Sequence, residues 1–184
     1  MHEIASRGQL RSSFFRLAIV TVPALILLGF LSGRAAPSGE DNAWYMALAK
    51  PEWQPPGWAF GITWSILYAM MGVALAVVLN ARGARGRALA IGLFAVQLAV
   101  NLAWSPLFFG VHMVSFAVVH IAIIFVLALA TTILFGRIRP IAAWLLVPYL
   151  AWLSFAFLLS LEVDRLNPDG ETLVVSGDTT QIAL

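Results

Sequence analysis

Two side-chain amides, Gln97 and Asn101, lie within an otherwise apolar run of this chain. At helical spacing they share one face with Trp104 and Phe108, and the four side chains fall within about 60° of one another. An amide inside a membrane is costly unless it is partnered, so such residues generally face a bundle interior or a cavity. The pattern allows two interpretations, an interhelical hydrogen bond that orders a bundle or a lined pocket, and the adjacent indole favours the pocket.

Two other apolar runs carry aromatic faces. At helical spacing, one run aligns Phe60, Trp64, Tyr68 and Met71, and another aligns Tyr149, Trp152, Ala156 and Ser160. An aromatic stripe of this kind is more often core than a ligand site. The two stripes and the amide-bearing face are nevertheless the candidates for one shared site.

The sequence shows no set of catalytic residues near these faces. The apolar runs contain no nucleophile with a nearby base, no convergent pair of carboxylates and no metal-ligand cluster. The absence of cysteine excludes disulfides and thiolate metal sites. His120 lies in the middle of one run, where a histidine most often makes an interhelical hydrogen bond; axial ligation of haem iron is the alternative.

Composition sets the class of protein that positions these residues. Hydrophobic residues make up 61% of the 184, charged residues 11%, and the mean hydropathy is +0.89, values outside the range of soluble domains. Five apolar runs reach the ~20 residues that a helix needs to cross a bilayer: residues 14–33, 58–80, 88–109, 113–135 and 141–161. Lipid cannot satisfy a bare backbone, so these runs must be helices. We expect an all-α integral membrane protein, a bundle of five transmembrane helices with short loops.

The five-helix domain occupies residues 14–166 in this interpretation. Residues 1–13 form a polar, basic extension, and residues 167–184 form a flexible polar tail. The first run could alternatively belong to a secretory signal peptide, but it is long for one, and residues 34–37 make a poor cleavage site. A retained first helix is therefore favoured.

Basic residues are distributed unequally between the two ends of such a bundle. One end collects Arg7, Arg11, Arg16, Arg82, Arg85, Arg87, Arg137 and Arg139, and the other has only Arg34, Lys50 and Arg165. In a bacterial membrane this bias predicts a cytoplasmic N-terminus, with the tryptophan-rich loop on the opposite face. Because these charges flank membrane spans, they do not indicate nucleic-acid binding.

Small residues line the opposite face of the run that carries the two amides. They are Ala88, Gly92, Ala95, Ala99 and Ala103. Small residues at such spacing let helix backbones approach closely in lipid. The face is therefore either a homodimer seam or an ordinary packing surface within the bundle.

Tryptophans and prolines alternate just before the second span. Trp53 and Trp58 are separated by Pro55 and Pro56, and proline fixes φ and removes an amide donor, so this stretch cannot be helix interior. A helix can begin directly after it. We interpret residues 50–58 as a stiff lid and Trp64 as part of the wall beneath it.

Three segments carry a resemblance to a known family: WYMALAKPEWQPPGWAFGITWSILYAMMG, QLAVNLAWSPLFFG and AWLLVPYLAWLSFAFLLSLEVDRLN. In order and spacing, over residues 43–167, they resemble the TspO/MBR family of tryptophan-rich sensory proteins, which includes the mitochondrial translocator protein. The resemblance implies a five-helix bundle, often dimeric, that binds porphyrins such as protoporphyrin IX or haem. In some members it extends to sterols, isoquinoline carboxamides and benzodiazepines.

Position by position, the resemblance implies a ligand pocket made largely of the faces identified above. Its residues are Trp53, Trp58, Trp64, Tyr68, Gln97, Asn101, Trp104, Tyr149, Trp152 and Ala156. A flat macrocycle suits aromatic walls, and amides suit its polar substituents. Ser160 replaces an asparagine common in the family, and no tyrosine lies between Trp152 and Arg165, so sterol recognition is poorly supported.

The function expected from the resemblance is a membrane receptor or sensor that binds porphyrins or similar flat hydrophobic ligands and influences tetrapyrrole handling or stress regulation. No obligatory cofactor is implied. One alternative is an enzyme that degrades bound porphyrin with light and oxygen, with Trp64 and Trp152 as the reacting indoles. Another is a porphyrin or sterol transporter, although the sequence shows no inverted-repeat or broken-helix signal.

Overall fold

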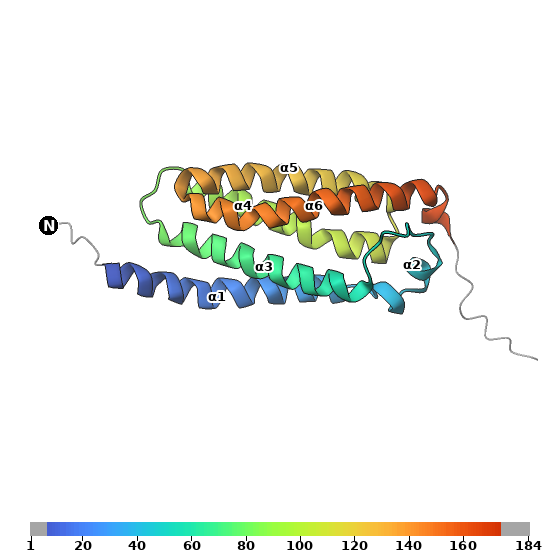
Figure 1. The fold of residues 1–184 in the computed structure, drawn as a ribbon, viewed down its shortest axis with the longest axis horizontal. Coiled ribbons are helices and arrows are strands. Elements are labelled where there is room, and N and C mark those ends of the chain that lie inside the picture. Colours follow the sequence, from blue (N-terminus) through green and yellow to red (C-terminus); the bar gives the residue numbers. More distant parts are fainter. Residues whose placement is uncertain (1–6, 174–184) are drawn as a thin grey trace, which may run out of the picture.

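The computed structural model describes residues 7–173, and their regular structure is helical. Five long helices, α1 (Arg7–Arg34), α3 (Gly57–Asn80), α4 (Arg87–Ser105), α5 (Val114–Ile138) and α6 (Pro140–Leu166), lie roughly parallel in one bundle (Figure 1). Short helices and turns complete the fold: η1 (Gly39–Asp41), α2 (Ala43–Ala47), η2 (Pro106–Gly110) and η3 (Gly170–Thr172). Within residues 7–173, five segments are long and apolar enough to cross a membrane, which confirms the predicted fold class.

The helices extend beyond the apolar runs that predicted them. Helix α1 begins at Arg7, not at residue 14, and α6 continues to Leu166, beyond residue 161. Hydropathy marks the part of a helix that suits hydrocarbon, whereas a helix continues through polar residues until a cap or a proline ends it. Only Arg139 separates α5 from α6, because Pro140 occupies the first turn of α6, where its missing N–H costs nothing. Residues 1–6 and 174–184 lie outside the described residues.

Helix α1 packs mainly against α3, while α6 contacts both α3 and α5, and α5 also contacts α4. The α1–α3 contact is close at Gly72, where an added Cβ would meet the Val22 Cα at 2.7 Å. Thr21 Oγ1 donates a hydrogen bond to the Gly72 carbonyl over 2.8 Å. Absence of a side chain at residue 72 therefore lets the two backbones meet and a hydroxyl bridge them.

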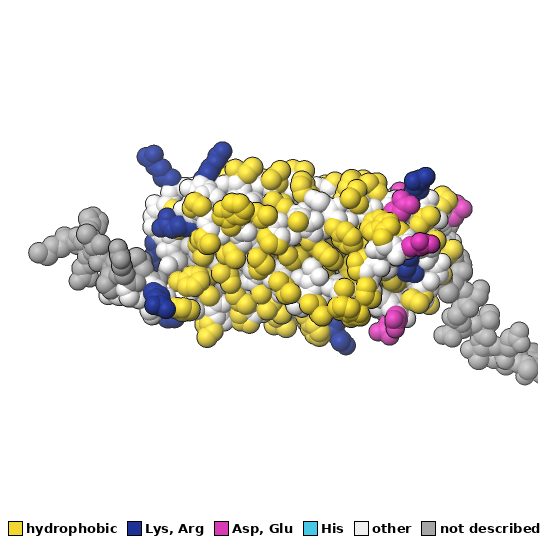
Figure 2. All heavy atoms as spheres, in the orientation of Figure 1, with side chains coloured by type: hydrophobic (Ala, Val, Ile, Leu, Met, Phe, Trp, Pro, Cys, Tyr) yellow, Lys and Arg dark blue, Asp and Glu magenta, His cyan; other side chains and the backbone are white. Residues whose placement is uncertain are grey.

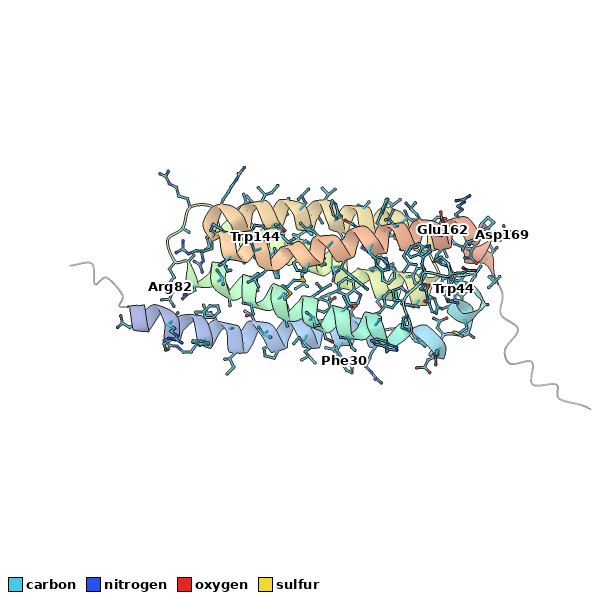
Figure 3. All side chains as sticks on the ribbon, in the orientation of Figure 1. Phe30, Trp44, Arg82, Trp144, Glu162 and Asp169 are labelled. Atoms are coloured by element: carbon cyan, nitrogen blue, oxygen red, sulfur yellow. The ribbon has the colours of Figure 1, made fainter. Side chains whose placement is uncertain are left out.

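Charge is segregated between the two ends of the bundle, as the sequence predicted. On the face drawn in Figure 2, acidic side chains lie only at the end that carries α2, and most basic side chains lie at the other end. Arg82 and Glu162, labelled in Figure 3, mark these two ends. The cytoplasmic position of the N-terminus stays a prediction from this bias.

The small-residue face of α4 is not used for packing within the bundle. Ala88, Gly92, Ala95 and Ala99 are exposed, and Ala103 is half-buried. An added Cβ at Gly92 would meet nothing within 4 Å. The alternative of ordinary intrabundle packing is therefore wrong for the first four positions, and the homodimer seam stays a prediction.

Candidate ligand-binding site

The two amides of α4 are buried and bonded to tyrosines on two other helices. Gln97 Oε1 accepts from the Tyr149 hydroxyl of α6 at 3.0 Å, and Asn101 Oδ1 accepts from the Tyr68 hydroxyl of α3 at 2.8 Å. Gln97 is 1% exposed and Asn101 5%. Of the two interpretations that the sequence allowed, the interhelical hydrogen bond is present, and it fixes α4 against α3 and α6. The pocket, which the adjacent indole favoured, stays a prediction.

Aromatic rings from α3 and α6 gather at these two hydrogen bonds. The Trp64 ring stacks on Tyr68 with centroids 5.5 Å apart, and it meets Tyr149 edge-on at 6.2 Å and Trp152 edge-on at 6.5 Å. We call Trp64, Tyr68, Tyr149 and Trp152 the aromatic cluster. Stacked and edge-to-face contacts are the arrangements that aromatic quadrupoles favour, so the cluster is a stiff wall.

Helix α1 supplies a residue that the sequence analysis missed. The Tyr68 ring occupies the space beside Gly29, where an added Cβ would lie 2.1 Å from Tyr68 Cε2. The tyrosine can reach Asn101 because residue 29 has no side chain. The first span has no polar stripe that faces the site, so its sequence gave no signal for this contact.

Trp104 lies in a second group of rings, toward the α2 end of the bundle. It stacks on Phe108 with centroids 4.9 Å apart and planes at 10°, and Phe108 in turn meets the buried Trp44 edge-on. The structure therefore does not bring Trp104 into ring contact with the aromatic cluster, although it packs on the same core as Trp64. Ala156 is half-buried against that core.

The chain after Trp104 forms a π-helical turn, η2, and side chains from other segments satisfy one carbonyl just before it and one within it. Pro106 has no N–H to donate to the Leu102 carbonyl one turn earlier; the Ser32 hydroxyl of α1 donates to that carbonyl. The buried Asn42 side chain donates to the Phe109 carbonyl at 3.0 Å. Turns of this type often lie at functional sites, and here polar side chains hold the turn in place.

Two indole N–H groups at the site are buried and have no acceptor among the described residues. They belong to Trp104 and Trp152. A buried N–H group without an acceptor is destabilising, because it has lost its hydrogen bonds to water without replacement. Both groups are therefore free to donate to a bound molecule.

The loop that was predicted to be a lid lies partly against the site. Trp53 meets Phe155 edge-on at 5.8 Å, and Phe155 packs on Trp152 at 5.1 Å. Trp58 is not part of this arrangement, since it is 69% exposed. The Lys50 ammonium lies 4.5 Å above the Tyr45 ring and donates to the Leu48 carbonyl, and partial burial lowers the pKa of Lys50.

A surface groove of about 410 Å³ runs between α3 and α6 beside the aromatic cluster. Leu67, Pro148 and Trp152 lie along it, so one indole borders both the groove and the cluster. Thr63 and Phe155 continue the lining toward the loop.

His120 makes the interhelical hydrogen bond that was expected of it. Its Nε2 lies 2.9 Å from the Val100 carbonyl of α4, so this nitrogen must carry the proton. Within residues 7–173 no group of three or more potential metal ligands of the His, Cys, Asp or Glu types is found. Axial ligation of haem iron by His120 stays a prediction.

Helices of this number and length, with buried amides and an aromatic wall between them, define an integral membrane protein of five spans. The chain belongs to the TspO/MBR family, whose model matches residues 19–166. The "Tryptophan-rich protein TspO" of Chlorobaculum tepidum is 39% identical over 145 residues, 78% of this chain and 90% of that protein. The human "Translocator protein" is 39% identical over 76% of this chain and 84% of its own length. The "Tryptophan-rich sensory protein" of Cereibacter sphaeroides is 36% identical over 77% of this chain and 91% of its own length.

Proposed function

We propose that this chain is a membrane receptor that binds a porphyrin, such as protoporphyrin IX or haem, against the aromatic cluster. In this role it influences tetrapyrrole handling or stress regulation. Membership of the TspO/MBR family supports the proposal, as does the name "sensory protein" borne by one relative. The ligand class follows from the family resemblance, and the geometry of the aromatic cluster supports the place of binding.

The observation that carries the proposal is the unpaired indole N–H of Trp152. It lies in an aromatic wall, it is buried, and no described residue accepts its hydrogen bond. A ligand that combines a flat apolar face with carbonyl or carboxylate oxygens satisfies both properties of this wall. Porphyrins with propionate groups have that combination.

The groove beside Trp152 offers a route for such a ligand. A hydrophobic molecule dissolved in the bilayer reaches the lipid-facing side of α3 and α6 without crossing water. Trp152 borders this groove and meets Trp64 edge-on, so it lies between the groove and the rest of the aromatic cluster. The proposal therefore places the porphyrin between the groove and the aromatic cluster.

The test is a titration of protoporphyrin IX against the protein in detergent, read by fluorescence quenching. Trp64→Ala removes a stacking surface, and Asn101→Ala removes the hydrogen-bond partner of the Tyr68 ring. Each variant is expected to bind protoporphyrin IX about tenfold more weakly. Trp144→Ala is the control, because Trp144 is 70% exposed at the end of the bundle remote from Trp44 (Figure 3). Circular dichroism checks that helical content is retained. Unchanged affinity in both site variants contradicts the proposal.

Degradation of the bound porphyrin is the second candidate function, favoured by the edge contact between the Trp64 and Trp152 indoles. An assay in darkness without oxygen separates the two. Binding without product under all conditions supports the receptor. Product that forms only with light and oxygen, and only when both indoles are present, supports the enzyme. The transporter alternative stays a prediction from the sequence.

A further inference from the structure

Asn167 ends α6, and its side chain is bonded to the loop that precedes α3. Nδ2 donates to the Val163 carbonyl at 2.7 Å and to the Ala49 carbonyl at 2.8 Å, while Oδ1 accepts from the Ala49 N–H at 2.8 Å. One amide thus bonds both backbone groups of Ala49, which fixes the orientation of that residue as well as its position. Asn167 is a clamp between the end of α6 and the loop.

The residues that follow Asn167 strengthen this attachment. Trp44 Nε1 donates to the Gly170 carbonyl at 2.8 Å, and an added Cβ on Gly170 would lie 3.3 Å from Leu48. Trp44 and Leu48 are each 4% exposed. Figure 3 places Trp44 and Asp169 at the same end of the bundle. The segment after α6 therefore packs on α2 and on the start of the loop, although the sequence predicted a loose tail from residue 167.

Beyond Ala49 the loop has little conformational freedom. Pro51, Pro55 and Pro56 each fix one φ angle, and the Gln54 N–H donates to the Pro51 carbonyl. The middle of the loop reaches α6 again where Trp53 meets Phe155. Because the segment between Ala49 and Trp53 is short and stiff, we expect release of Ala49 to shift Trp53 as well.

We propose that Asn167 is the latch that holds the loop of residues 48–56 over the aromatic cluster and so sets how fast a bound ligand leaves. Asn167 is a positioning residue, because it bonds to the loop and not to the cluster. The identity of the ligand rests on the proposed function, whereas the latch itself does not. Opening breaks the two hydrogen bonds between Asn167 and Ala49 and the ring contact of Trp53 with Phe155. It also strains the bond from Gln54 Nε2 to the Tyr45 hydroxyl of α2, 3.0 Å long. This remains a small unit of local structure that can open without unfolding the bundle.

The position of the loop is measured first, without any ligand. The chain contains no cysteine, so spin labels on Glu52→Cys and Leu158→Cys, both at exposed positions, report one loop-to-α6 distance by pulsed electron resonance. Asn167→Leu removes the clamp at similar volume, and Asn167→Asp keeps only the acceptor for the Ala49 N–H. Both are expected to broaden and lengthen the distance distribution, while Leu166→Ala, at the exposed neighbour, leaves it narrow. A narrow, unchanged distribution in both Asn167 variants overturns the latch.

Ligand exit is measured second, from the dissociation rate of protoporphyrin IX. Protoporphyrin IX is expected to dissociate from the Asn167→Leu variant about tenfold faster than from the parent protein. The substitution should change the dissociation rate more than the association rate. A broadened distance distribution with an unchanged dissociation rate would show that Asn167 holds the loop but does not set the rate of ligand release. If protoporphyrin IX binds neither protein, the proposed ligand is wrong, and the spin-label distances still decide the latch.

Discussion

The ring of Tyr68 lies against Gly29, so close that a Cβ on residue 29 would stand 2.1 Å from Tyr68 Cε2. Tyr68 also donates its hydrogen bond to Asn101. A glycine on α1, the least buried of the five spans, therefore determines where the Tyr68 ring can lie.

Gly29→Ala is expected to displace the Tyr68 ring and to break its hydrogen bond with Asn101. Protoporphyrin affinity should fall by about tenfold, because the Trp64 ring loses the surface on which it stacks. Gly33→Ala is the matched control, since a Cβ there meets nothing within 4 Å. Equal affinity of the two variants would show that Tyr68 does not depend on Gly29.

Gly72→Ala is expected to separate α1 from α3, because its Cβ would meet backbone atoms of Val22 at 2.7 and 3.0 Å. Overpacking of this kind costs about 1–3 kcal/mol, and the Thr21 hydrogen bond is strained as well. Reversible unfolding in mixed micelles measures the loss. Gly61→Ala, on the same helix with open space around it, should be neutral or slightly stabilising. A neutral Gly72→Ala contradicts the close contact.

Gly92→Leu tests the predicted homodimer seam on the exposed face of α4. Because a large side chain keeps two backbones apart, the variant should be monomeric in nanodiscs where the parent is dimeric, as measured by mass photometry. Leu89→Ala, at an exposed large residue, serves as the control. If the parent is monomeric, or if the variant is still dimeric, this face of α4 is not a homodimer seam.

His120→Ala separates the two roles of that histidine. Since Nε2 is already bonded to the Val100 carbonyl, the substitution should lower the stability of the bundle by about 1 kcal/mol and leave the Soret band of a haem titration unchanged. A shifted or lost Soret band would establish axial ligation in place of the structural role.

Much of this fold follows from the apolar runs and their periodicity. Run length predicted the five helices, and helical spacing predicted that Gln97 and Asn101 face other helices, where tyrosines meet them. Aromatic spacing likewise placed Trp64 and Trp152 on facing helices.

Close contacts between helices, and the irregular backbone around Pro106, could not be predicted from such patterns. Gly29 and Asn167 act through contacts that depend on where distant segments meet, which residue periodicity does not encode. The same is true of Ser32, which satisfies a carbonyl freed by Pro106 on another helix. Trp58 is 69% exposed, and its predicted part in the ligand site stays a prediction.

The most direct test of porphyrin binding at the aromatic cluster replaces one indole by a ring that lacks the N–H group. Trp152→Phe keeps an aromatic side chain at the wall but removes the buried donor that has no acceptor among the described residues; Trp144→Phe makes the same change at an exposed position. Protoporphyrin IX titrations should show about tenfold weaker binding for Trp152→Phe and parental binding for Trp144→Phe. Parental affinity in both variants would contradict a porphyrin bound at the aromatic cluster.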